Sequence, residues 1–390
     1  MIVIAVILAV IGQLVSADQQ QQLALSSAVS DFSQRLYQKV ALDESNVVYS
    51  PYSIHSLLTM TSLGARGDTA TEMKDVLGIT SLGDSVHSIY RETIQQFNSQ
   101  SRIQLLTGNA IFINPSYPIV PEFIQETSDK YLAKADNIDF NADGGPEKPI
   151  NDYIEVKTEH VIKDLLEPDS IDGLTVMLLV NTLFFNGTWN SPFEEELTRK
   201  QDFKLLGGTV KQIDMMYGSQ RRTNIKKDDV NNVDVAEIPF RGRRFALYIA
   251  LPRACDGITD LENLLQQPGK VDELFTGLQF KTVEMTIPKF RIETKLELED
   301  VLVDMGMVKA FSEELADFSG ISHGVYISRV IHQAVIDVQE SGTVAAAVTV
   351  GEASSRSIPV IVPFIADHPF LYFLRDNETG QILFQGRFSG

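Results

Sequence analysis

Few residue patterns in this sequence resemble catalytic machinery. The clearest is Gly320-Ile321-Ser322-His323-Gly324, which has the G-x-S-x-G spacing of a hydrolase nucleophile elbow. That elbow requires an apolar strand before the serine, so that the hydroxyl is held at a sharp turn. Residues 314–318 read Glu-Leu-Ala-Asp-Phe, which predicts a polar helix end instead. We therefore expect that Ser322 is not a nucleophile and that the protein is not an enzyme.

Two other kinds of site are weighed and set aside. Arg66-Gly67-Asp68 has the letters of an integrin-binding tripeptide, but the same residues suit a turn that closes the helix before them, and we expect the turn. Six histidines are scattered without metal-ligand spacing, and no glycine-rich phosphate loop precedes a helix. We expect no metal site and no cofactor.

The segment from Glu340 to Ser357 has an unusual pattern of small and β-branched residues without proline. Alternate residues of an extended chain point to opposite faces. One face of this segment would carry only small side chains, namely Thr343, Ala345, Ala347 and Thr349. The other face would carry Val344, Ala346, Val348 and Val350, which favour extended backbone. A solvated loop has no need for this alternation, whereas a segment that slides between two packed strands does, because large side chains would collide there.

The elements that must position this segment are helices first and strands later. Apolar residues at helical spacing predict a helix through Val29, Phe32, Leu36 and Val40, another with Ser53 as its N-cap that ends near Gly64, and a third from Ile150 to Leu166. Val176 to Phe185 is almost wholly apolar, which predicts a strand covered on both faces. Further strands are predicted at 245–251, 283–287 and 334–338, with a hairpin over 370–384. This order predicts the α+β class, in a single domain from residue 18 to 390.

Charge excludes some partners and suggests another. The net charge of −19 argues against binding to nucleic acid, because phosphate backbones repel an acidic protein. One basic stretch stands out, formed by Arg221, Arg222, Lys226, Lys227, Arg241, Arg243 and Arg244. It could bind a heparin-like polyanion such as a glycosaminoglycan, or it could be a pair of solvated turns that flank strands.

The first 17 residues have the features of a secretory signal peptide. They contain no charged residue, and an apolar run leads to Val15-Ser16-Ala17, a small-residue cleavage pattern. The alternative is an uncleaved anchor, but the run from Ile2 to Ile11 is shorter than the roughly 20 residues that span a bilayer. We expect a secreted, extracellular protein that does not bind membranes. Its single cysteine, Cys255, cannot form an internal disulfide.

The sequence resembles the serpin family over essentially the whole chain after the signal peptide. The hinge of the serpin reactive loop resembles Glu340, Gly342, Thr343 and the alanines Ala345, Ala346 and Ala347. Other family landmarks are similar to 46–54, 63–69, 181–189, 287–290, 305–307, 317–320, 364–370 and 382–387. The resemblance implies helices packed on large, mostly antiparallel sheets, with an exposed reactive loop at about 340–362.

The resemblance also implies a mechanism and a target. In inhibitory serpins a protease cleaves the loop, and the upstream part inserts into a sheet while the protease remains attached. The family cleaves fourteen residues after the hinge glycine, which gives the bond Arg356–Ser357. Arginine at this position suits trypsin-like proteases, whose specificity pocket ends in a carboxylate. We expect a monomer whose partner is such a protease; the alternative is a non-inhibitory serpin, either a carrier or a chaperone.

Other residues are assigned through the same resemblance. Ser53, Asn181 and His332 resemble the polar cluster beneath the sheet that controls its opening, called the shutter. Trp189 lies where insertion begins, called the breach. The sequons at Asn377 and Asn186 predict glycosylation, although Asn186 adjoins the breach.

Overall fold

The computed structural model describes residues 17–41, 43–99, 103–342 and 360–390. Most helices lie in the first part of the chain and most strands in the second, and the α+β prediction is confirmed. The helices are α2 (Ala17–Val40), α3 (Pro51–Ser62), α4 (Gly67–Leu77), α5 (Ser85–Asn98), α6 (Pro121–Tyr131), α7 (Glu147–Lys157), α8 (Ile258–Leu265), α9 (Lys270–Leu274) and α10 (Glu299–Asp304).

Two sheets organise these helices. The five-stranded sheet has the order β10-β11-β4-β2-β3, and the nine-stranded sheet has the order β1-β14-β13-β8-β7-β6-β9-β12 with β5 paired to β6. The strands of the first are β2 (Ile103–Ile113), β3 (Lys134–Asn137), β4 (Met177–Gly187), β10 (Phe290–Glu297) and β11 (Arg329–Val338). Those of the second are β1 (Val47–Tyr49), β5 (Arg199–Lys204), β6 (Val210–Asp228), β7 (Val233–Pro239), β8 (Phe245–Pro252), β9 (Gln279–Pro288), β12 (Ile361–Ile365), β13 (Phe370–Asp376) and β14 (Ile382–Phe388).

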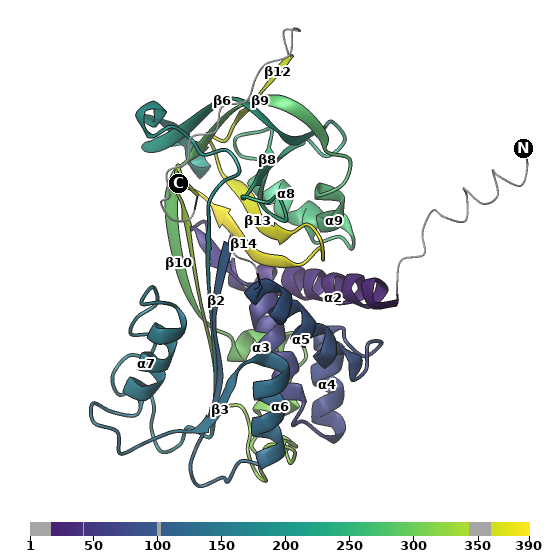
Figure 1. Ribbon diagram of the computed structural model, residues 1–390, viewed down its shortest axis with the longest axis vertical. Helices are drawn as coiled ribbons and strands as arrows, with labels where there is room; N and C mark the ends of the chain where they lie inside the picture. Colours follow the sequence, from purple (N-terminus) through teal and green to yellow (C-terminus); the bar gives the residue numbers. More distant parts are fainter. Residues whose placement is uncertain (1–16, 42, 100–102, 343–359) are drawn as a thin grey trace, which may run out of the picture.

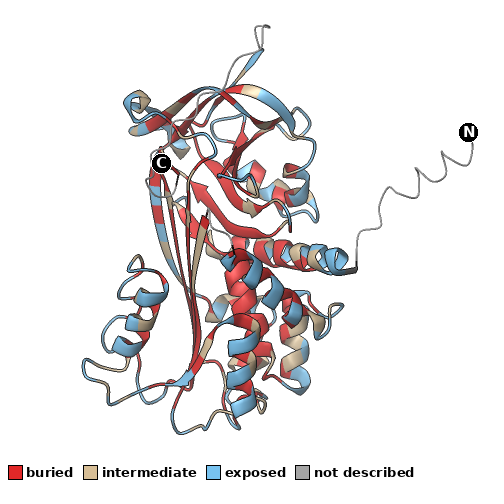
Figure 2. Cartoon of the chain, in the orientation of Figure 1, coloured by how far each residue is buried: buried red, intermediate tan, exposed pale blue. Residues whose placement is uncertain are grey.

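The five-stranded sheet is covered on both faces. Helices α3 to α6 lie on one side of it and α7 lies on the other (Figure 1). The main hydrophobic core fills the first side, and a smaller core beneath α7 includes Ile150, Ile154, Leu178 and Val335. Buried residues therefore run continuously along the central strands (Figure 2). This explains the apolar run of β4, since a strand with both faces buried needs no polar alternation.

Two predicted helix boundaries are wrong. The helix predicted from Ile150 to Leu166 ends at Lys157, because Glu159 and His160 have positive φ, which takes the backbone out of the right-handed helical path. The N-cap predicted at Ser53 is also wrong, because α3 already begins at Pro51 and Ser53 lies within it. Its N-cap is Ser50, whose side chain accepts a hydrogen bond from the Ser53 N–H, and proline is well suited to the first helical position.

Candidate functional site

The centre of the five-stranded sheet contains a parallel pair of strands, β11 and β4, with His332 opposite Asn181 in the register. The other neighbours of these two strands, β10 and β2, are antiparallel to them. An additional strand that ran antiparallel to both β11 and β4 could therefore fit between them. Two antiparallel ladders would replace one parallel ladder, which is the less stable kind per residue.

The chain reverses direction directly after β11 and points back toward this parallel pair. Gly342 forms antiparallel bridges with both Gln339 and Thr188, so it is paired to the ends of both strands. Its φ is +135°, and a Cβ at this position would lie 2.1 Å from the Gly187 carbonyl oxygen. Only glycine fits here without a backbone shift. The described part of this segment stops at Gly342, which is the hinge residue predicted from the sequence.

The backbone around the hinge is fixed by Trp189. This side chain is 1% exposed, stacks on Phe240 with a centroid distance of 4.3 Å, and donates its indole N–H to the Gln339 carbonyl oxygen at 2.8 Å. Its own backbone N–H donates to the Ser341 carbonyl oxygen. These contacts place Trp189 beside the end of β11 and Gly342; its role in insertion stays a prediction.

Glu340 forms the polar part of the same region. One of its carboxylate oxygens accepts a hydrogen bond from the Thr198 hydroxyl and the other pairs with the Lys289 ammonium, both at 2.8 Å. Burial opposes ionisation of Glu340, but these two donors outweigh burial and lower the pKa of its carboxyl below the usual value. Glu340 is therefore an anion that ties the hinge to Thr198, just before β5, and to Lys289, between β9 and β10. Sequence reasoning did not identify Lys289 or Thr198 as its partners.

The three predicted shutter residues come together under the parallel pair. Asn181 and His332 face each other across β4 and β11, and Ser53 reaches them from α3. The Nε2 atom of His332 accepts a hydrogen bond from the Ser50 N–H at 3.0 Å, so the ring proton lies on Nδ1 and is donated to the Asn181 side-chain oxygen. The Asn181 amide nitrogen then donates to the Ser53 hydroxyl and to the Asn109 side-chain oxygen.

Burial and satisfied hydrogen bonds make this cluster a rigid connection between α3, β2, β4 and β11. Its residues are between 0% and 8% exposed. Burial also lowers the pKa of His332 to about 3, so the ring is neutral at pH 7. Sequence reasoning missed Ser50 and Asn109. Ser50 could have been found, because a serine before a proline is an N-cap signal, whereas Asn109 has no local signal that distinguishes it.

Comparison with known proteins agrees with this geometry. The family model described as serpin (serine protease inhibitor) matches residues 27–390. The chain belongs to the serpin family. It is 34% identical to an uncharacterized serpin-like protein of Thermococcus kodakarensis, covering 94% of this chain and 86% of the relative. It is 32% identical to the human leukocyte elastase inhibitor, covering 94% and 99%.

Solved structures place this serpin in the same fold. A serpin of the insect Tenebrio molitor, described as highly specific, superposes with a TM-score of 0.84 at 32% identity, covering 94% of this chain and 98% of the other. Uncleaved ovalbumin gives a TM-score of 0.84 at 27% identity, covering 94% and 100%. The predicted serpin fold is thereby confirmed.

Several predicted residues of this serpin lie outside the described residues. These are the reactive bond Arg356–Ser357, the hinge residues Thr343, Ala345, Ala346 and Ala347, and all but the last residue of the signal peptide at 1–17. Their assignments stay predictions.

The two sequons of this serpin lie in ordered, partly buried surroundings. The Asn377 amide nitrogen donates to a Glu237 carboxylate oxygen at 3.1 Å, and its side-chain oxygen accepts from the Tyr248 hydroxyl at 2.8 Å. Asn186 lies within β4 and its amide bonds Gln104 at 3.4 Å. An attached glycan would replace one of the two amide hydrogens of each asparagine and would have to be accommodated beside these partners; glycosylation stays a prediction.

The basic stretch of this serpin is divided among separate environments. The Arg221 guanidinium is buried over the Phe193 ring at 3.9 Å, where burial lowers the pKa of Arg221 to about 10. Arg244 forms a two-bond ion pair with Asp376, which is fully buried. Lys226 and Lys227 pair with Asp228 and Asp234. Arg222, Arg241 and Arg243 remain as the part of the stretch that could meet a polyanion.

The other motifs have structural explanations. The Ser322 residue is 3% exposed in a loop, and no strand precedes it in the described segment 312–324, so the nucleophile elbow is absent there. Arg66 bonds the carbonyl oxygens of Leu63 and Ala65, and Gly67 opens α4.

Cys255 is an exposed free cysteine after β8. Within the described residues, no helix is long and apolar enough to cross a bilayer, and no group of His, Cys, Asp or Glu is arranged to hold a metal ion.

Proposed function

We propose that this serpin is a secreted inhibitor of trypsin-like serine proteases that acts by insertion of its reactive loop. The observation that carries the proposal is the double pairing of Gly342 at the top of the parallel pair β11 and β4. One relative, the human leukocyte elastase inhibitor, is a protease inhibitor by name, which also supports the proposal.

The pairing of Gly342 defines a register for the inserted loop. We continue the antiparallel pairing of the loop from the Gly342–Gln339 bridge along β11 and from the Gly342–Thr188 bridge along β4. Ala345 then lies opposite Ile336 and Phe185, and Ala347 lies opposite Ala334 and Leu183. The two extensions agree, since Thr349 falls opposite both His332 and Asn181, which already face each other. Residues opposite one another in an antiparallel ladder point to the same face.

This register explains the alternation of small and larger residues in the loop. The partners of Ala345 and Ala347 are at most 1% exposed and belong to the main core, so the small residues would enter the side that is already packed. Val348 and its neighbours would face the smaller core beneath α7, to which Val335 belongs. Each backbone hydrogen bond gained is worth about 1 kcal/mol net, and buried apolar surface adds about 25 cal/mol per Å².

The chemistry of trapping follows from the acyl intermediate of serine proteases. The protease serine oxygen attacks the Arg356 carbonyl carbon, the Arg356–Ser357 amide bond breaks, and Ser357 leaves as a new amino terminus that takes up the proton. Arg356 then remains joined to the protease through an ester. Insertion of the segment before Arg356 would carry the protease along before water can hydrolyse that ester.

The test is a reaction with bovine trypsin analysed on denaturing gels. We expect a covalent complex that survives SDS, and its loss in Arg356→Glu, because the trypsin pocket rejects an anion. Arg241→Glu, which changes an exposed arginine outside the loop, is the matched control and should still form the complex. Cleavage at Arg356 without any complex would favour a non-inhibitory serpin and overturn the proposal.

Secretion has a separate test. Expression of the full chain in a eukaryotic cell line should release a protein whose amino terminus is Asp18. Retention in the cell with residues 1–17 still attached would refute the signal peptide.

A further inference from the structure

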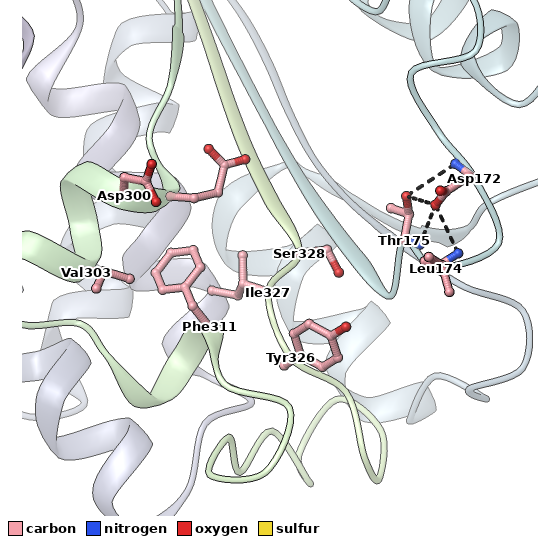
Figure 3. Close-up of a pocket in the computed structure, with 10 residues that line it drawn as sticks. Asp172, Leu174, Thr175, Asp300, Val303, Phe311, Tyr326, Ile327 and Ser328 are labelled. Carbon is pink, nitrogen blue, oxygen red and sulfur yellow. Dashed lines mark hydrogen bonds between the residues drawn. The ribbon is translucent and has the colours of Figure 1, made fainter.

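Two hollows on the described surface differ in the side chains that line them. One, of about 340 Å³, lies between α10 and the segments before β4 and β11, and Asp172 and Asp300 are among its lining residues (Figure 3). An acidic cluster alone does not identify a ligand, so no binding is assigned to this hollow. The other, of about 350 Å³, lies beside the start of β12 and combines cationic with apolar side chains. It is lined by Arg222, Phe280, Lys281, Thr282, Val360 and Val362.

The ring of Phe280 is the centre of this second surface. The guanidinium carbons of Arg222 and Arg243 lie 5.2 Å and 5.7 Å from the centroid of the ring. Because β6 pairs Arg222 with Thr282 of β9, Arg222 and Phe280 are diagonal neighbours on one face of the sheet. Arg243 reaches the same ring from the turn between β7 and β8. We call Arg222, Arg243 and Phe280 the arginine–phenylalanine patch.

The patch is exposed, and its charges are not neutralised by the fold. Both arginines are exposed, and the Phe280 ring is 50% exposed. Neither guanidinium forms an ion pair with a carboxylate of the described residues, and the exposed Lys281 adds a further positive charge beside them. Two like charges beside one ring repel each other, and an incoming carboxylate would relieve that repulsion.

The patch adjoins the point where the reactive loop rejoins the sheet. At the top of Figure 1, β12 runs beside β9, with Ile361 paired to Thr282. Four residues of chain join Arg356 to Val360, so the two are separated by at most about 14 Å. A standard protein interface covers about 800 Å² per partner, which is a circle of about 16 Å radius. A protease centred on the Arg356–Ser357 bond would therefore extend over the hollow.

The mixture of charge and apolar surface identifies the kind of partner. The arginines offer forked N–H donors that suit carboxylates. Beside them, Val360 is 86% exposed and Ile361 is 42% exposed, in addition to the Phe280 ring. A sulfated polysaccharide would use the cations and leave this apolar surface in water, whereas a protein surface would use both. Arginine and aromatic residues are also the types that are enriched in protein interfaces.

We propose that the arginine–phenylalanine patch is a second contact surface for the target protease, and that it binds a carboxylate-bearing surface beside the protease active site. This inference rests on the proposed function, because it requires a protease that docks at Arg356. The patch then selects among proteases that all cleave after arginine. It acts in the encounter complex, before the amide bond is cleaved, so it changes the rate of inhibition and leaves the later insertion of the loop unaltered.

The experiment compares inhibition of the anionic and cationic forms of bovine trypsin, which both cleave after arginine. In Arg222→Ala/Arg243→Ala the second-order rate constant with anionic trypsin should fall about tenfold relative to that with cationic trypsin, since exposed ion pairs each contribute a factor of roughly two to five. The effect should shrink in 1 M NaCl, because salt screens the pairing. The number of inhibitor molecules consumed per trypsin should stay at the wild-type value.

Matched variants make the result specific. Arg91→Ala/Lys211→Ala removes the same charge from exposed positions on α5 and at the far end of β6, and it should keep the wild-type ratio of the two rate constants. Arg222→Lys/Arg243→Lys keeps the charge and should restore most of the rate with anionic trypsin.

The possible failures can be told apart. If the wild-type protein forms no covalent complex with either trypsin, the proposed function fails and this surface fails with it. If complexes form and Arg222→Ala/Arg243→Ala keeps the wild-type ratio of rate constants, the surface alone is refuted. Acceleration by heparin that is lost in this variant, with an unchanged ratio in the absence of heparin, would assign the patch to a polyanion. Dimers of the wild type that dissociate in the variant, measured by sedimentation, would assign it to a second copy of the chain; both results would overturn the proposal.

Discussion

Acidification should destabilise the folded protein through His332. The Nε2 atom of the ring accepts a hydrogen bond from the Ser50 N–H. Protonation of Nε2 would place a second N–H donor opposite the Ser50 N–H at the start of α3, and two donors cannot form a hydrogen bond with each other. The folded ring therefore resists protonation, and burial lowers its pKa to about 3, whereas an unfolded histidine has a pKa of about 6.5. The same reasoning applies to His55, which is fully buried and whose pKa burial lowers to about 4.

The sign and size of the effect follow from proton linkage. Because the folded pKa is depressed, the full contribution of the neutral ring is present above about pH 6.5 and is lost progressively as the pH falls toward 3. Between pH 7 and pH 5 the unfolded state takes up a proton that the folded state does not. The loss is about 1.5 pH units at about 1.4 kcal/mol each, or about 2 kcal/mol for His332 and a similar amount for His55.

Urea unfolding at pH 7.0 and pH 5.0 measures this loss. The free energy of unfolding should fall between pH 7.0 and pH 5.0 in both the wild type and His332→Gln. The fall should be about 2 kcal/mol smaller in His332→Gln, and this comparison does not depend on the absolute stability of the variant. His323→Gln, which removes an exposed histidine, should keep the wild-type pH dependence. An identical pH dependence in His332→Gln and the wild type would show that His332 titrates normally and would refute the hydrogen-bond assignment in the shutter.

Three further predictions concern the hinge and the free thiol. Glu340→Gln should lower the free energy of unfolding by about 1 kcal/mol in urea titrations at low salt, and by less in 1 M NaCl, because Lys289 is partly exposed. Gly342→Ala should lower it by about 2 kcal/mol, more than Gly277→Ala, because both glycines have positive φ but only the Cβ at 342 would meet backbone. A thiol reagent such as Ellman's reagent should label Cys255 in the folded protein without denaturant; absence of labelling would contradict its exposure.

Local patterns predicted the strands better than the helix ends. The apolar runs at 176–185 and 245–251 correspond to β4 and β8, because a strand buried on both faces leaves a compositional signal that needs no knowledge of its neighbours. The end of α7 was missed, because apolar residues continue at helical spacing after Lys157 although the backbone turns away. Those later residues, such as Ile162, are buried in the smaller core, but they belong to a loop and not to a helix.

The site could be assigned only through the family resemblance. Ser53, Asn181 and His332 are far apart in the chain, and no spacing rule brings them together; the parallel register of β11 with β4 does so. The partner of Glu340 was likewise hidden, although Lys289 lies in a segment that the resemblance had marked. The alternation of small residues in the loop was interpreted without structure as a packing requirement of a buried strand; these residues lie outside the described ones, so that interpretation stays a prediction.

Because Trp189 lies at the hinge end of the five-stranded sheet, its fluorescence reports on that end of the sheet. It is the one tryptophan in the sequence, so selective excitation of indole reports a single site in the isolated protein. Its ring is sealed against Phe240 and bonded to Gln339, which favours emission characteristic of a dry environment. Separation of the strands there would admit water and shift the emission toward longer wavelengths. Intrinsic fluorescence can therefore report separation of the strands at this end of the sheet in real time and without a label.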